Sequence, residues 1–163
     1  MRHILSVLFE NSFNAIPRIA GLFSGRGYNI TSISFGQGED PEMTRATITT
    51  EGDEQIIEQI AKQLHKLVDV VKVVDMTYEP FVERELALIK VQSTPVTRAE
   101  IMQITDIFRG SIIDLSGKTV TIEITGKTDK INAAIGMLEG FGIREIARTG
   151  AIALKREYQG SKK

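Results

Sequence analysis

The polar residues with the clearest chemical potential lie where a predicted strand meets a predicted helix, from Glu10 to Ile16. A β-rich apolar stretch ends there, and apolar residues then recur at helical spacing. Free N–H groups at a helix start suit a carboxylate, and the helix dipole adds to the attraction. Asn11 and Asn14 add amides that can donate or accept, as an amino acid's carboxylate and ammonium require. The junction therefore predicts a site for a small zwitterion.

Further contacts are predicted just after that helix. Asn29 begins the next strand with a polar side chain, and Ile30 and Ile33 could line a small apolar pocket. The alternative is purely structural, with Asn14 capping the helix and Asn29 sitting in a turn. Residue types alone favour this alternative, so they do not establish the site.

Groups for catalysis or metal binding do not come together in this sequence. The chain has no cysteine, which excludes disulfides, thiolate metal sites and a cysteine nucleophile. Its two histidines, His3 and His65, have no third ligand at metal spacing. No Gly-x-Ser-x-Gly elbow occurs, and Gly25-Arg26-Gly27 follows a predicted helix, whereas a dinucleotide loop opens one. We therefore predict a non-catalytic chain without a metal or cofactor of its own.

Composition also bounds the partners. The length of 163 residues suits one medium domain or two small ones, and a hydrophobic content of 42% is enough for a packed core. No apolar run approaches the length of a membrane span, so no membrane contact is predicted. Twenty basic residues against 21 acidic ones give a net charge of −1, which makes a nucleic-acid partner a poor fit. The absence of cysteine favours a cytoplasmic protein.

The predicted elements run strand, helix, strand, strand, helix, strand, and then repeat. Pro80 breaks a continuing strand and predicts a boundary that separates residues 1–78 from 79–163. Each half matches a ferredoxin-like βαββαβ unit, so we expect an α+β chain with two such domains in tandem. Helices would cover one sheet face and leave the other for a second domain or chain. Strands are predicted at 3–9, 28–35, 43–50, 68–74, 86–91, 112–115, 119–125 and 143–154, the last with a candidate interruption at Gly150; helical apolar faces are predicted at 15–23, 56–67, 101–108 and 131–138.

An ordered series of stretches across nearly the whole chain carries a family resemblance. The stretches are LFEN at 8–11, RIAGLF at 18–23, RGYNI at 26–30, QIAKQLHKLVDV at 59–70, VEREL at 82–86, IFRG at 107–110, IID at 112–114 and EIARTG at 145–150. In this order they resemble the small subunit of acetolactate (acetohydroxyacid) synthase, whose first domain is an ACT domain.

The resemblance implies a regulatory subunit in branched-chain amino-acid biosynthesis. Such a subunit activates a catalytic (large) subunit and confers feedback inhibition by valine, which binds where the first domains of a homodimer meet. The catalytic partner carries thiamine diphosphate, magnesium and FAD, and this chain would carry none of them. Matched by position, the effector contacts are Asn11, Asn14, Ala15 and Ile16 from one subunit and Asn29 and Ile30 from the other.

One position departs from the family pattern. Where this chain has Asn14, the family usually has glycine, which permits positive φ and close backbone approach. Asparagine tolerates the left-handed region better than most residues, so the turn can persist. Its side chain would still occupy space beside the effector. The identity of the effector and the strength of feedback are therefore open at this position.

Two other functions fit the sequence less well. Ferredoxin-like sheets also serve as nucleic-acid-binding modules, but such a module requires aromatic side chains on its sheet and a basic surface. Only 6% of residues are aromatic, and the chain has no tryptophan. A small independent enzyme lacks a nucleophile–base pair that could be assembled from this sequence. The corresponding loop of the second half, Thr94-Pro95-Val96-Thr97, lacks the asparagine pair, which predicts a role in assembly for that half.

Overall fold

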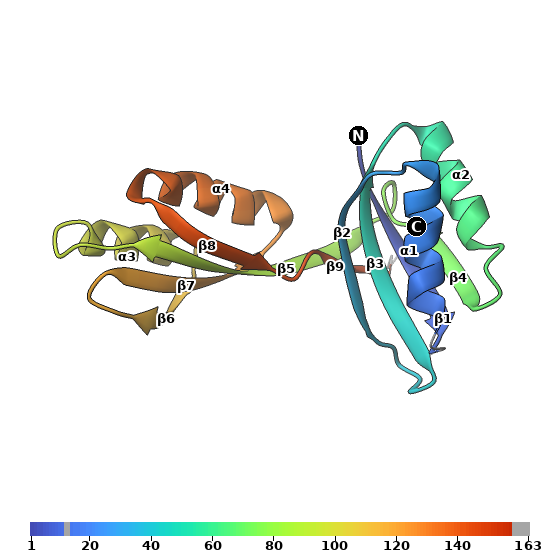
Figure 1. Cartoon of the computed structure of the whole chain (residues 1–163), viewed down its shortest axis with the longest axis horizontal. Coiled ribbons are helices and arrows are strands. Elements are labelled where there is room, and N and C mark those ends of the chain that lie inside the picture. The colour runs from blue at the N-terminus through green and yellow to red at the C-terminus, as the bar shows by residue number, and fades with distance from the viewer. Residues whose placement is uncertain (12–13, 158–163) are drawn as a thin grey trace, which may run out of the picture. The chain divides into compact units, whose positions relative to one another are not determined.

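The computed structural model describes residues 1–11 and 14–157, which fold into two compact units (Figure 1). The first unit comprises Met1–Val82 together with the described residues from Ala151 onwards, and the second comprises Glu83–Gly150. No helix in the described part of the chain is long and apolar enough to cross a membrane.

The first unit has the predicted order of elements. These are β1 (Arg2–Glu10), α1 (Ala15–Arg26), β2 (Ile30–Gln37), β3 (Met43–Glu51), α2 (Glu54–Leu64) and β4 (Val70–Asp75). The sheet order is β2-β3-β1-β4, and each neighbouring pair is antiparallel. This is a ferredoxin-like βαββαβ arrangement.

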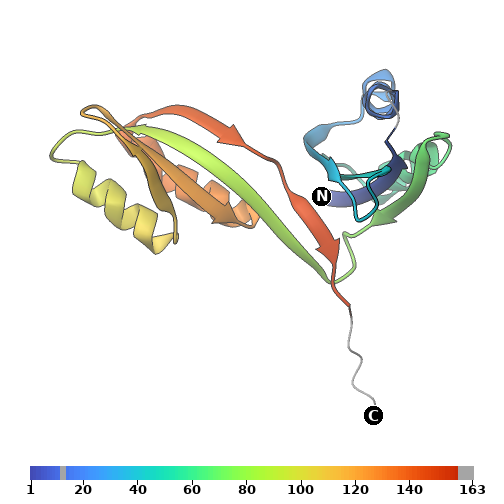
Figure 2. The ribbon, with the colours of Figure 1, turned by 90° about the horizontal axis from the view of Figure 1, so that it is seen from below.

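The second unit repeats the arrangement. Its elements are β5 (Phe81–Gln92), α3 (Arg98–Ile107), β6 (Ser111–Leu115), β7 (Thr119–Gly126), α4 (Thr128–Leu138), a short 3-10 turn (Glu139–Phe141) and β8 (Ile143–Arg148). The path β6-β7-β5-β8 is the same strand order as in the first unit. Figure 2 shows α3 and α4 on one side of this sheet. The predicted tandem of two ferredoxin-like units is therefore confirmed.

Strand alternation determines which side chains enter each core. In β1, Leu5, Val7 and Phe9 point to the same face and pack with the buried side of α1 and α2. In the second unit Ala87, Ile89 and Val91 do the same beneath α3 and α4. The predicted apolar face of α1 needs one correction. Ile16 is 45% exposed, because Ala15 takes the buried place at the start of the helix.

The C-terminal segment returns to the first unit. The strand predicted over 143–154 breaks at Gly150, which has φ 75°, and resumes as β9 (Ile152–Lys155), which pairs with β5. Ala153 packs against Ile4 and Met76, and its N–H donates to the Thr47 hydroxyl over 3.3 Å. Residues 151–157 thus cover part of the sheet face that α1 and α2 leave open. They belong with the first unit, although the sequence-based division places them in the second domain.

Candidate functional site

The predicted site begins where α1 starts. Asn14 takes the N-cap position with φ −98° and ψ −5°, and the first helical hydrogen bond runs from the Arg18 N–H to its carbonyl. This backbone conformation is open to any residue, so asparagine at the position where the resemblance implies glycine brings no backbone strain here. Among the described residues the Asn14 side chain makes no capping hydrogen bond. The amide is therefore not committed to the cap that the structural alternative assigns it.

The helix start offers backbone donors beside an apolar side chain. The first N–H groups of a helix have no partner within it, and here they belong to Ala15 and Ile16. Pro17 lacks an N–H and fits the first turn of the helix. Ala15 is buried against the core, whereas Ile16 is exposed. A carboxylate can meet the two N–H groups while an apolar group contacts Ile16.

Asn11 directly follows β1, and backbone hydrogen bonds hold the end of that strand. The Asn11 N–H donates to the Glu42 carbonyl over 2.8 Å, and the preceding N–H, of Glu10, donates to the Asp69 carbonyl over 2.8 Å. Asn11 itself is exposed. Residues 12–13, between the two asparagines, lie outside the described residues. The hydrogen-bonded backbone thus leaves the Asn11 side chain in solvent at the end of β1.

Asn29 and Ile30 lie at the other end of α1. Gly27 ends the helix with φ 67°, and the Asn29 carbonyl accepts a hydrogen bond from the Thr50 hydroxyl. The residue is exposed, while Ile30 is half-buried against the core. The 12 residues of α1 span about 18 Å, so one chain does not bring Asn29 close to Asn11. Ile33 also packs against the core, which gives it a structural role.

Neither histidine belongs to a cluster of metal ligands within the described part of the chain. His3 is buried, and its Nδ1 lies 3.1 Å from the Thr77 hydroxyl, which in turn donates to Asp75. Because Thr77 has a single hydrogen, His3 donates from Nδ1. His65 is exposed at the end of α2. In residues 1–11 and 14–157 no group of three His, Asp or Glu side chains could hold a metal ion.

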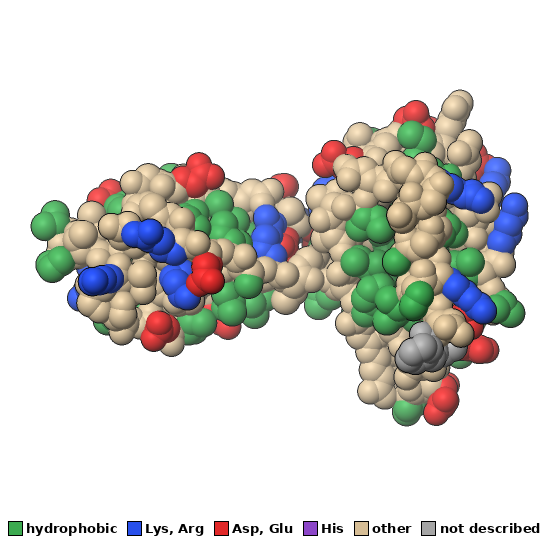
Figure 3. Space-filling view, viewed as in Figure 1, with side chains coloured by type: hydrophobic (Ala, Val, Ile, Leu, Met, Phe, Trp, Pro, Cys, Tyr) green, Lys and Arg blue, Asp and Glu red, His purple; other side chains and the backbone are tan. Residues whose placement is uncertain are grey.

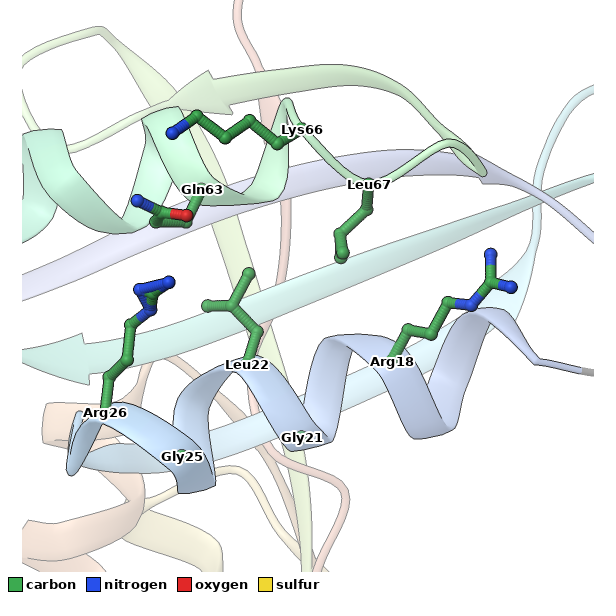
Figure 4. A pocket seen from close by; sticks show the side chains of 8 residues that line it. All are labelled: Arg18, Gly21, Leu22, Gly25, Arg26, Gln63, Lys66 and Leu67. Carbon is green, nitrogen blue, oxygen red and sulfur yellow. The ribbon is translucent and has the colours of Figure 1, made fainter.

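A shallow groove of about 450 Å³ separates the exposed side of α1 from the end of α2 (Figure 4). Its α1 side carries two glycines, Gly21 and Gly25, and a Cβ at either would meet nothing within 4 Å. Each glycine costs about 1 kcal/mol in a helix interior relative to alanine, so packing within the chain does not explain them. The groove joins residues of α1 with residues at and after the end of α2, so local sequence patterns do not predict it. The lining residues are Arg18, Gly21, Leu22, Gly25, Arg26, Gln63, Lys66 and Leu67.

A second hollow lies on the sheet face of the first unit opposite the helices. Arg45 donates to the Ser6 hydroxyl over 3.2 Å and to both carboxylate oxygens of Glu39 over 3.0 and 3.1 Å. A backbone hydrogen bond and then Arg45 lower the pKa of the Glu39 carboxyl. Within this hollow, the charges of Arg45 and Glu39 are thus already paired with each other.

The helix-start loop of the second unit is closed by its own hydrogen bonds. The N–H of Thr94 donates to the Thr97 hydroxyl over 3.0 Å, and the N–H of Thr97 donates to the Thr94 hydroxyl over 3.2 Å. Val96, between them, is 88% exposed. This turn pairs its polar groups with one another, whereas Asn11 and Asn14 in the first unit are exposed.

The comparisons with known proteins agree over both units. Residues 5–72 match the family described as an AHAS small subunit-like ACT domain, and residues 84–157 match the small subunit of acetolactate synthase. The acetolactate synthase small subunit of Aquifex aeolicus is 51% identical over 158 residues, covering 96% of this chain and 82% of that protein. The isozyme 3 small subunit of Escherichia coli is 45% identical over 96% of each chain. The crystal structure of the acetolactate synthase small subunit from Thermotoga maritima superposes with a TM-score of 0.88, at 44% identity, over 97% of this chain and 99% of that one.

Proposed function

This chain belongs to the small-subunit family of acetolactate synthase, and from that membership we propose that it activates a catalytic subunit and makes it sensitive to valine. Family membership makes it a regulatory subunit that partners a catalytic large subunit. The proposal adds the direction of the effect, the effector and the pathway, which is branched-chain amino-acid biosynthesis. The reaction would take place on the catalytic subunit, which in this proposal carries thiamine diphosphate, magnesium and FAD.

The single observation that carries the effector proposal is the start of α1. Two backbone N–H groups, of Ala15 and Ile16, suit a carboxylate, and the amides of Asn11 and Asn14 can accept from an ammonium. The exposed Ile16 side chain offers a surface for a branched aliphatic group. A branched-chain amino acid has all three of these groups. Valine satisfies them with a side chain small enough to lie beside Asn14.

A second copy of the chain would complete this site. Asn29 and Ile30 lie about 18 Å from the start of α1 in their own chain, which supports a site shared across a homodimer. In this proposal the first domain, residues 1–78, binds effector and dimerises, and the second domain supports assembly. The hydrogen-bonded turn at Thr94–Thr97 supports that division, since it leaves fewer groups for a ligand.

Calorimetry of the purified chain with valine, leucine and isoleucine tests the effector directly. We expect valine to bind and a chemically unrelated amino acid such as lysine not to bind. In parallel, acetolactate formation is measured for the catalytic subunit alone, with the chain, and with the chain plus valine. Activation by the chain and its reversal by valine would support the proposal. No heat with any of the three amino acids, or no effect of the chain on activity, would contradict it.

A further inference from the structure

We propose that the groove between α1 and α2 is a docking site for an acidic segment of the catalytic subunit. This inference rests on the proposed function, because it assumes that such a partner is bound. The groove has an apolar floor formed by Leu22 and Leu67, both half-buried against the core of the first unit. Cationic side chains stand along its rims, as the close view shows (Figure 4).

Two of the cationic side chains that line the groove can still form ion pairs with a partner. Arg26 and Lys66 are exposed, and neither side chain makes an ion pair or hydrogen bond with another described residue. Arg18 pairs with Asp69 over 2.7 Å, yet its side chain is still 46% exposed. Figure 3 shows Lys and Arg side chains gathered along the helical side of the first unit. A carboxylate-bearing segment would complement this surface.

The glycines on the α1 side point to close approach by another backbone. Gly21 and Gly25 are exposed, and nothing within the chain fills the space beside them. Glycine is among the least favourable residues in a helix, so its presence twice on one face requires a reason outside this chain. A partner helix or strand can lie directly on such a surface, where any larger side chain would hold it away.

The length of the groove distinguishes an extended partner from a small anion. Arg18 and Arg26 are eight residues apart on one helix, a rise of about 12 Å. A single carboxylate or phosphate cannot reach both. A segment with acidic residues near its ends and an apolar residue between them would meet both cations and the Leu22–Leu67 floor. Recognition of an amphipathic segment in a groove follows this pattern.

The same helix would connect docking to sensing. α1 starts at the proposed effector site and continues along the groove. In this proposal, valine bound at the helix start shifts α1 against α2 and so changes the width of the groove. Docking and valine binding would then influence each other reciprocally.

Three full-length variants test the docking site, each measured for affinity to the catalytic subunit. Gly21→Leu fills the groove, and the double variant Arg26→Glu with Lys66→Glu reverses its charge without adding bulk. Gly136→Leu is the matched control, because Gly136 is an exposed glycine of α4 with the same open space around it and lies outside the groove. We expect both groove variants to bind at least about tenfold more weakly, and the control to stay within about twofold. The double variant should also lose most of the salt dependence of binding.

Other measurements separate the possible failures. The melting temperatures of the isolated variants should not fall below that of the unaltered chain, and their valine binding should match that of the unaltered chain. Either groove variant binding the catalytic subunit with unaltered affinity would overturn the docking site. So would a change confined to self-association of the chain, because a second copy would then occupy the groove. If the unaltered chain itself failed to bind the catalytic subunit, the proposed function would fail together with the docking site.

Discussion

At the scale of single residues, Asn29 has a firmly held backbone and an exposed side chain. Its carbonyl accepts from Thr50, a contact that Asn29→Ala leaves in place. The variant should therefore change stability by no more than about 0.5 kcal/mol. A hydrogen bond to a bound zwitterion contributes about 1.5–3 kcal/mol, so valine inhibition should weaken about tenfold or more. The measurement is a valine inhibition curve for the complex with the catalytic subunit.

The matched control for Asn29 is Gln55→Ala, which removes an exposed amide from α2. It should leave both the inhibition curve and the melting temperature unchanged. An unaltered curve for Asn29→Ala with a stable protein would remove Asn29 from the effector site. A large fall in melting temperature would instead show that Asn29 serves the turn after Gly27.

Arg148 and Glu85 form the ion pair with the largest expected effect on stability. Glu85 is 3% exposed and accepts two hydrogen bonds from the Arg148 guanidinium, over 2.5 and 3.1 Å. Arg148→Ala would leave a buried carboxylate without this partner. We expect the free energy of unfolding to fall by about 2 kcal/mol. This loss is smaller than for a fully buried ion pair, because Arg148 is partly exposed. Denaturant unfolding measures the loss. Adding Glu85→Gln should recover part of it.

The exposed pair Lys90–Glu145 provides the comparison. Its hydrogen bond and charges raise the pKa of Lys90 and lower that of Glu145, but water screens both groups. Lys90→Ala should therefore change stability very little. A loss of stability as large as that of Arg148→Ala would show that burial does not determine how much these two ion pairs contribute to stability.

At the scale of elements, β9 is expected to stabilise the first unit through Ala153. This side chain is 4% exposed between Ile4 and Met76, so Ala153→Asp would place a carboxylate in an apolar contact. We expect a loss of about 2 kcal/mol or more in a thermal or denaturant melt. The neighbouring Leu154 is 60% exposed, and Leu154→Asp should have little effect. Equal effects of the two substitutions would contradict the packing of β9 on this sheet.

In α1, by contrast, a substitution is expected to increase the stability of the chain. Gly21 lies in the helix interior with open space around it, so Gly21→Ala should stabilise the isolated chain by about 0.5–1 kcal/mol. A melt of the chain alone measures this gain. A destabilised variant would mean that the glycine is required by the fold, and the case for an external partner on this helix face would lose its basis.

At the scale of the whole molecule, a chain that ends at Tyr78 tests whether the first domain alone binds effector and dimerises. It should still dimerise and bind valine within a few-fold of the full chain, because every proposed effector contact lies before that point. Without residues 151–157, Ile4 and Met76 lose a covering contact, so its melting temperature should fall. A folded fragment that binds no valine would contradict the division.

The local pattern of apolar and polar residues was sufficient to predict the helices and strands and their order along the chain. Apolar residues at helical or alternating spacing predicted both ferredoxin-like units, and Gly150 was identified as an interruption before β9. These features depend on residues close together in sequence, whose preferences act over one or two turns. The same local information placed Asn14 at the start of α1 and Gly27 at its end.

Features that join distant segments were decided only by the tertiary structure. Nothing in residues 151–157 shows which sheet they will cover, because Ala153 meets Ile4 and Met76 only after the chain has returned. The groove between α1 and α2 likewise needs Arg26 and Lys66 to be brought together from separate helices. The predicted effector residues lie at opposite ends of α1, which follows from helix length once the helix bounds are fixed. Packing over long sequence separations determines all three features, whereas local patterning determines only the elements that pack.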